Sequence, residues 1–98
     1  MIKTVEIKGY CDPEFQSVSD AFKKNFEDGY EVGSSLAVML NGKTKVDIWG
    51  GYCDLKQTKP WEENTIVNVF STTKVMTALC CHVLIDRGLI DINTPVFK

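Results

Sequence analysis

The chain has 98 residues, 44% hydrophobic and 24% charged, a composition typical of one globular domain with its own core. Its formal net charge of -2, without a dense cluster of lysine and arginine, argues against nucleic acid or an anionic membrane as a partner. No apolar run approaches the roughly 20 residues of a membrane span. Residues 1–10 alternate charged and apolar side chains, unlike a signal peptide. Unless a leader has already been removed, we expect a cytoplasmic protein.

The first predicted element is a helix between Asp12 and Gly29. Asp12 is a favoured N-cap residue, Pro13 suits the first helical position, and Gly29 is a typical stop. The apolar side chains repeat at helical spacing on one face, which predicts packing against a sheet. These side chains are Phe15, Val18, Phe22 and Phe26.

A β-hairpin is predicted next. The apolar run Leu36–Leu40 indicates a central strand buried on both faces. Asn41-Gly42 is the preferred dipeptide of a two-residue hairpin turn. Residues 43–49 then alternate polar and apolar, as a second strand would. Gly50-Gly51 ends the hairpin.

The rest of the chain is predicted to be a connecting segment, an extended stretch over residues 65–70 and a final helix over residues 71–87, with Gly88 after its end. Most of two faces of this helix are apolar, so it requires cover on more than one side. The Leu36–Leu40 strand likewise has no predicted strand to flank it. These uncovered faces predict that the chain is the N-terminal part of a larger protein.

The four cysteines, Cys11, Cys53, Cys80 and Cys81, have no C-x-x-C spacing, and a reducing compartment would keep them as free thiols. Cys80, Cys81 and His82 are adjacent, and adjacent helical positions point about 100° apart, so they do not converge on one ion. No metal site is therefore expected.

Ser71-Thr72-Thr73-Lys74 has the S-x-x-K spacing. Roughly 0.4 chance matches are expected in a chain of this length, so the spacing alone is weak. Its position at a helix start favours catalysis, since unpaired N–H groups there stabilise negative charge. Lys74 lies one turn along, and burial of a lysine disfavours its charged form. The alternative, an ordinary first turn with Ser71 as the N-cap, stays open on local physics alone.

His82 is excluded as the base for Ser71. The two residues are eleven positions apart, roughly 16 Å along a helix axis, so their side chains do not touch. We expect His82 to be a core or edge residue.

The segment from Val67 to Val96 resembles the active-site segment of the serine β-lactamase-like hydrolases, in particular the class C β-lactamase and family VIII carboxylesterase branch. The resemblance rests on the S-x-x-K motif after Phe70 and on the exit from Gly88 to Val96, "GLIDINTPV". It also includes the hairpin that ends in Trp49-Gly50-Gly51. It implies an α/β (α+β) fold of the β-lactamase/transpeptidase type, an antiparallel sheet flanked by helices.

The resemblance also implies a mechanism. Ser71 would be the acyl-accepting nucleophile, Lys74 would help to deprotonate it, and the Ser71 N–H would supply half of an oxyanion hole. The substrate would be a small-molecule ester, with a lactam or an amide as further possibilities, and no cofactor is implied. The natural substrate and the oligomeric state are left open.

Two further parts of such a site are missing. Tyr10, Tyr30 and Tyr52 are not followed by asparagine two residues on, and neither a lysine nor His82 starts a K/H-x-G motif of the expected type. Residues 1–98 are therefore predicted to be the N-terminal part of a single catalytic domain. This part alone is expected to be inactive, and its expected partner is the remainder of the same chain. Two alternatives stay open: a non-catalytic binding or assembly module with this fold, and a small domain that self-associates.

Overall fold

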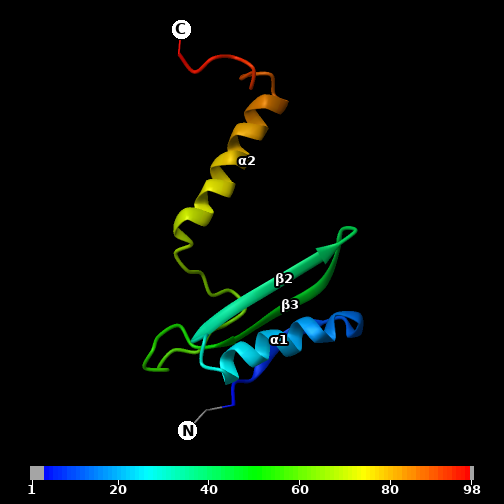
Figure 1. Ribbon diagram of the computed structural model, residues 1–98, viewed down its shortest axis with the longest axis vertical. Helices are drawn as coiled ribbons and strands as arrows, with labels where there is room; N and C mark the ends of the chain where they lie inside the picture. Colours follow the sequence, from blue (N-terminus) through cyan, green and yellow to red (C-terminus); the bar gives the residue numbers. More distant parts are fainter. Residues whose placement is uncertain (1–3, 98) are drawn as a thin grey trace. The chain divides into compact units, whose positions relative to one another are not determined.

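The computed structural model describes residues 4–97, and the chain divides into two compact units. The first unit ends at Thr65 and contains a three-stranded sheet and a helix. The second unit begins at Ile66 and contains a helix and the segments that flank it (Figure 1).

The first helix is present as predicted, although its first turn is tighter than an α-helix. A 3-10 helix, η1 (Pro13–Phe15), leads into α1 (Gln16–Glu27). The Asp12 carboxylate accepts a hydrogen bond of 3.0 Å from the Glu14 N–H, which confirms Asp12 as the N-cap. Gly29 follows the helix with a left-handed φ of 79°, as the stop requires.

The sheet is antiparallel and has the strand order β1-β3-β2, where the strands are β1 (Ile7–Cys11), β2 (Gly33–Leu40) and β3 (Lys43–Gly51). The predicted hairpin is confirmed. Asn41 and Gly42 connect β2 to β3 with φ values of 52° and 74°, the pair of positive angles that a two-residue turn of the primed type needs.

The Leu36–Leu40 run, predicted to lie in a central strand, lies in the edge strand among the described residues. β2 is an edge strand, and Ala37 and Met39 on one of its faces are exposed. The central strand is β3, because β1 pairs with its other edge. The sequence analysis did not predict β1. Without this third strand, β3 could not be recognised as the central strand.

The core of the first unit lies between α1 and one face of the sheet. Phe22 and Phe26 from α1 pack edge to face, with ring centroids 5.3 Å apart, and are buried with Val46 and Ile48 of β3. Figure 1 shows α1 running beside the hairpin. Burial of one such side chain contributes about 1.5–3 kcal/mol, so these four side chains are the main attachment of α1 to the sheet.

A partly buried ion pair fastens the start of η1 to β3. The Lys45 ammonium lies 3.1 Å from the Asp12 carboxylate, and the Asp12 N–H donates to the Lys45 carbonyl oxygen at 2.8 Å. The hydrogen bond from Glu14 N–H, followed by that from Lys45, lowers the pKa of the Asp12 carboxyl. The hydrogen bond to Asp12 raises the pKa of the Lys45 amine.

Gly51, the last residue of β3, lies where the surrounding atoms leave no space for a Cβ. Its φ is 81°, and a Cβ there would collide with the Val32 carbonyl oxygen and approach a ring carbon of Phe26 at 2.7 Å. The second glycine of the Trp49-Gly50-Gly51 stretch is therefore required by the packing of α1 and by the turn into Tyr52.

The second unit contains η2 (Phe70–Thr72) and α2 (Thr73–Asp86). The predicted helix is confirmed, with Gly88 after its end at a φ of 70°. Residues 65–69, expected to be extended, form no strand. Among residues 4–97, no helix is both long enough and apolar enough to cross a membrane.

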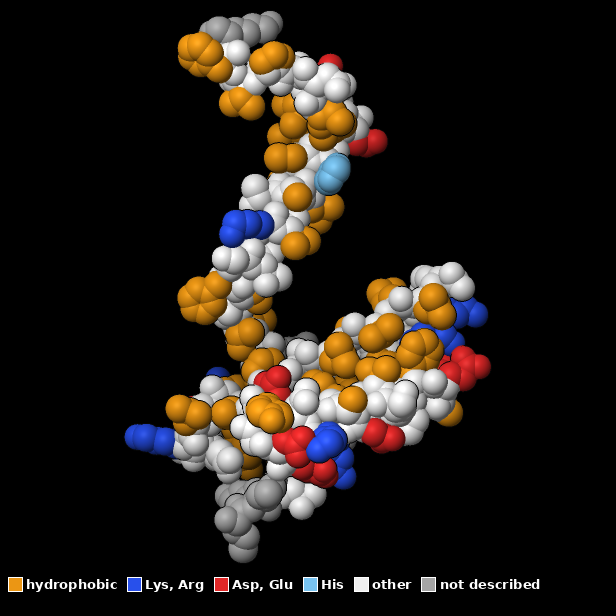
Figure 2. All heavy atoms as spheres, in the orientation of Figure 1, with side chains coloured by type: hydrophobic (Ala, Val, Ile, Leu, Met, Phe, Trp, Pro, Cys, Tyr) orange, Lys and Arg blue, Asp and Glu red, His pale blue; other side chains and the backbone are white. Residues whose placement is uncertain are grey.

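The apolar side chains of α2 are uncovered in the second unit. Val75, Met76 and Leu79 are 66%, 57% and 53% exposed, and Figure 2 shows apolar side chains along the helix. Thus the predicted apolar faces are present, and the other described residues of the second unit do not bury them.

Candidate functional site

The predicted nucleophile lies in the turn that leads into α2. The Thr72 N–H donates to the Val69 carbonyl oxygen at 3.0 Å, which closes a four-residue turn with Phe70 and Ser71 in its middle. Phe70 has a positive φ of 47°. The Thr73 N–H donates in turn to the carbonyl oxygens of Phe70 and Ser71. Hydrogen bonding into the helix therefore starts at Thr72.

Ser71 is not the N-cap of the helix. It is the middle residue of η2, and neither η2 nor α2 has a capping hydrogen bond from a side chain. Within residues 4–97, neither its N–H nor its hydroxyl has a hydrogen-bond partner. The structure thus leaves both groups of Ser71 available, and the ordinary capping role considered above is not observed.

Lys74 is the second residue of α2, one turn after Ser71. No hydrogen bond joins the two side chains, and Lys74 has no ion pair with any described residue. Lys74 is exposed in the second unit, as are the apolar side chains of α2 around it. Ser71 and Lys74 are therefore one turn apart at the start of α2, and their side chains are not hydrogen-bonded to each other.

The other polar and sulfur groups of α2 form no cluster. Cys80, Cys81 and His82 are all exposed in the second unit, and the three side chains occupy successive positions of α2. Among residues 4–97, no three His, Cys, Asp or Glu side chains gather as a metal ion would require.

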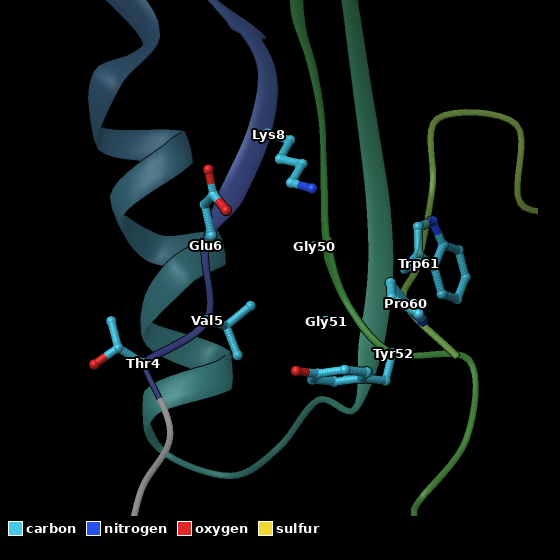
Figure 3. A pocket seen from close by; sticks show the side chains of 9 residues that line it. All are labelled: Thr4, Val5, Glu6, Lys8, Gly50, Gly51, Tyr52, Pro60 and Trp61. Atoms are coloured by element: carbon cyan, nitrogen blue, oxygen red, sulfur yellow. The ribbon is translucent and has the colours of Figure 1, made fainter. Parts of the chain in front are cut away.

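The first unit has a hollow that sequence reasoning did not predict. Its volume is about 420 Å³, within the range of small-molecule pockets. Figure 3 shows Tyr52, Pro60 and Trp61 on one side of it and the segment from Thr4 to Lys8 on the other, with Gly50 and Gly51 between them. It contains neither Ser71 nor Lys74, and no motif would have revealed it.

The loop after β3 carries one wall of this hollow and is held by Asp54. The Asp54 carboxylate accepts hydrogen bonds from the Thr58 hydroxyl at 2.7 Å, the Thr58 N–H at 2.9 Å and the Lys59 N–H at 3.1 Å. These bonds, led by that from the Thr58 hydroxyl, lower the pKa of Asp54. The Trp61 N–H then donates to the Gly51 carbonyl oxygen at 2.9 Å, which ties the end of the loop to β3. The Trp61 indole Nε1 is buried and has no hydrogen-bond partner among the described residues.

Comparisons with known proteins agree on one family. Residues 19–98 match the model of the Beta-lactamase family. The chain is 44% identical over 88 residues to the esterase/beta-lactamase LipL of Mycobacterium tuberculosis. It is also similar to a crystal structure of a family VIII carboxylesterase, with a TM-score of 0.88 and 49% sequence identity over 91% of the chain.

These matches extend over most of the chain but over a minor part of each relative. The chain spans 20% of the length of the Mycobacterium tuberculosis protein and 24% of the carboxylesterase chain. The antiparallel sheet with its helices, predicted above from the resemblance, is therefore confirmed as part of this fold.

Proposed function

Because the chain belongs to the Beta-lactamase family, we propose that it is the N-terminal part of the catalytic domain of a serine hydrolase that acts on ester carbonyls. One observation carries the proposal. Ser71 lies in the turn that leads into the helix that bears Lys74, and among the described residues its N–H and hydroxyl are unpaired. The names of the relatives, an esterase/beta-lactamase and a carboxylesterase, support the ester as substrate class.

The proposed reaction has two steps. The Ser71 hydroxyl oxygen attacks the carbonyl carbon while the Lys74 amine, in its neutral form, accepts the hydroxyl proton. The Ser71 N–H donates to the oxygen that becomes negative, and the alcohol leaves with the proton that Lys74 accepted from Ser71. A water oxygen then attacks the acyl carbon, a proton of that water passes to the Ser71 oxygen, and the carboxylic acid leaves. No cofactor takes part in this scheme.

The proposed catalytic domain includes residues beyond the 98 of this chain. The apolar side chains of α2 are exposed in the second unit, which supports a role for additional residues in covering them. The same cover would desolvate Lys74 and favour its neutral form. We therefore propose that residues 1–98 alone do not hydrolyse esters.

The test uses the complete natural protein that contains these residues. We expect it to hydrolyse p-nitrophenyl esters, and Ser71→Ala to lower kcat by on the order of 10³-fold or more. Ser17→Ala, which removes an exposed hydroxyl from α1, is the matched control and is expected to keep full activity. Equal activity of Ser71→Ala and the wild-type protein would exclude the proposed nucleophile. Nitrocefin in place of the ester tests whether a lactam is also a substrate.

A further inference from the structure

The hollow of the first unit has a fixed wall. The Trp61 N–H donates to the Gly51 carbonyl oxygen at 2.9 Å, and Tyr52 and Pro60 form an isolated antiparallel bridge. The Asp54 carboxylate closes the loop between these contacts. Because both ends of the loop are attached to the end of β3, the wall exists before any ligand binds. A preformed site of this kind loses less conformational entropy on binding.

The floor of the hollow is bare backbone. Gly50 and Gly51, the last two residues of β3, line it without side chains. Figure 3 shows them between residues 4–8 on one side and Pro60 with Trp61 on the other. A volume of about 420 Å³ is therefore left open above the sheet, within the range that small molecules occupy.

The wall formed by Pro60 and Trp61 is apolar. Trp61 is half-buried, and its one polar side-chain atom, Nε1, is buried without a hydrogen-bond partner among the described residues. The exposed part of the indole therefore consists of carbon atoms. Pro60 beside it is exposed and adds a second apolar ring. Such a wall favours a flat apolar group packed against it.

Lys8 brings a positive charge to the opposite side. Its side chain is exposed and lines the hollow, and Figure 3 shows it extending toward Gly50. Lys8 has no ion pair with any residue among 4–97. The Tyr52 hydroxyl, directed toward Val5, is a second donor without a partner in the described part of the chain. Glu6 also lines the hollow and carries the opposing charge, but Figure 3 shows its carboxylate beside its own strand.

We propose that this hollow binds an aromatic monocarboxylate, with its ring against Pro60 and Trp61 and its carboxylate at the Lys8 ammonium. A carboxylate accepts charge-assisted hydrogen bonds from an ammonium group, which are stronger than bonds between neutral groups. The proposed site does not include Ser71 or Lys74. It therefore does not depend on the proposed hydrolysis, and either proposal can fail without the other.

The experiment uses the complete natural protein and three ligands with nearly the same flat body: cinnamate, its uncharged amide cinnamamide, and the cation cinnamylammonium. Isothermal titration calorimetry measures each dissociation constant. We expect cinnamate to bind with a Kd on the order of 1 mM, as befits a ligand of this size. Cinnamamide and cinnamylammonium are expected to bind at least about threefold more weakly, because neither offers a negative charge to Lys8.

Two charge variants locate the site. Lys8→Met is expected to weaken cinnamate binding by about threefold to tenfold, and Glu6→Gln to strengthen it by about twofold, since it removes the repelling carboxylate. Lys56→Met removes an exposed lysine of the same loop that does not line the hollow, and it should leave the Kd unchanged. Thermal unfolding shows that each variant is folded. If Lys8→Met does not fold, Glu6→Gln and the three ligands decide.

Three results would overturn the proposal. No binding of cinnamate to the folded protein at millimolar concentration would mean that the hollow is not open to such a ligand, for example because further chain fills it. Equal affinity of folded Lys8→Met and the wild-type protein would place the bound cinnamate elsewhere. Tighter binding of cinnamylammonium than of cinnamate would show that Glu6, and not Lys8, sets the charge preference.

Discussion

Ser71 and Lys74 lie three residues apart across the junction of η2 and α2, and no hydrogen bond joins their side chains. A base one helical turn from a nucleophile needs little side-chain movement to reach it. The arrangement thus supplies the order and the spacing of the two groups. In the proposed mechanism, desolvation by further chain makes the lysine a proton acceptor.

The first prediction concerns Lys74. Lys74→Met and Lys74→Arg are both expected to lower the acylation rate of the complete protein by about 10²–10⁴-fold, the usual contribution of a general base. Arginine fails in this role because its guanidinium stays protonated. The rate of the p-nitrophenol burst is the measurement. Arg87→Met, which removes a cation at the other end of α2, is the control. Wild-type acylation in Lys74→Arg would rule out proton transfer to Lys74.

The second prediction concerns the ion pair of Asp12 with Lys45. The pKa of Asp12 is lowered in the folded protein, so its stabilisation is present above the unfolded value near 3.8 and is lost as the pH falls through the lowered folded pKa. The pKa of Lys45 is raised, so its stabilisation is present below about 10.5 and is lost as the pH rises through the folded pKa.

Urea unfolding across the pH range measures the loss of stability at acid pH and the loss at alkaline pH. We expect Asp12→Asn to flatten the decline of stability at acid pH, because the amide has no proton to gain. Glu63→Gln, which changes an exposed carboxyl without a hydrogen bond among residues 4–97, should leave that decline as it is. If Asp12→Asn and the wild-type protein lose stability in parallel at low pH, the pair does not contribute as described.

The third prediction separates two costs of replacing a glycine. Gly51→Ala introduces a Cβ into the Val32 carbonyl oxygen and the Phe26 ring, and we expect it to lower the free energy of unfolding by about 2–4 kcal/mol. Gly29→Ala has a nearly equal φ of 79° but no atom within 4 Å of the new Cβ, so a loss of about 1 kcal/mol is expected. Equal losses in urea unfolding would mean that close packing at Gly51 has no cost of its own.

The local parts of the fold were predictable because local chemistry determines them. Asp12 caps a helix, and Asn41-Gly42 closes a hairpin, whatever the rest of the chain does. β1 was missed because most of its side chains are exposed, so it has little apolar pattern. Its pairing with β3, from Ile7 with Gly50 to Cys11 with Val46, joins residues far apart in the sequence and makes it a strand.

The candidate site was predictable in part. The S-x-x-K spacing and the helix were both evident in the sequence, and the resemblance assigned roles to Ser71 and Lys74. The left-handed Phe70 was not predictable, because phenylalanine is not a residue that favours positive φ. Lys74 is exposed in the second unit, and the apolar faces of α2, which were predicted to need cover, are exposed there as well.

Fluorophosphonate labelling of the complete folded protein, with the adduct located by peptide mass spectrometry, tests the role of Ser71 most directly. We predict one adduct, on Ser71, which is absent from Ser71→Ala and present in Ser17→Ala. An unlabelled Ser71 in the folded protein, or full labelling of Ser71→Ala at another residue, would contradict the central claim.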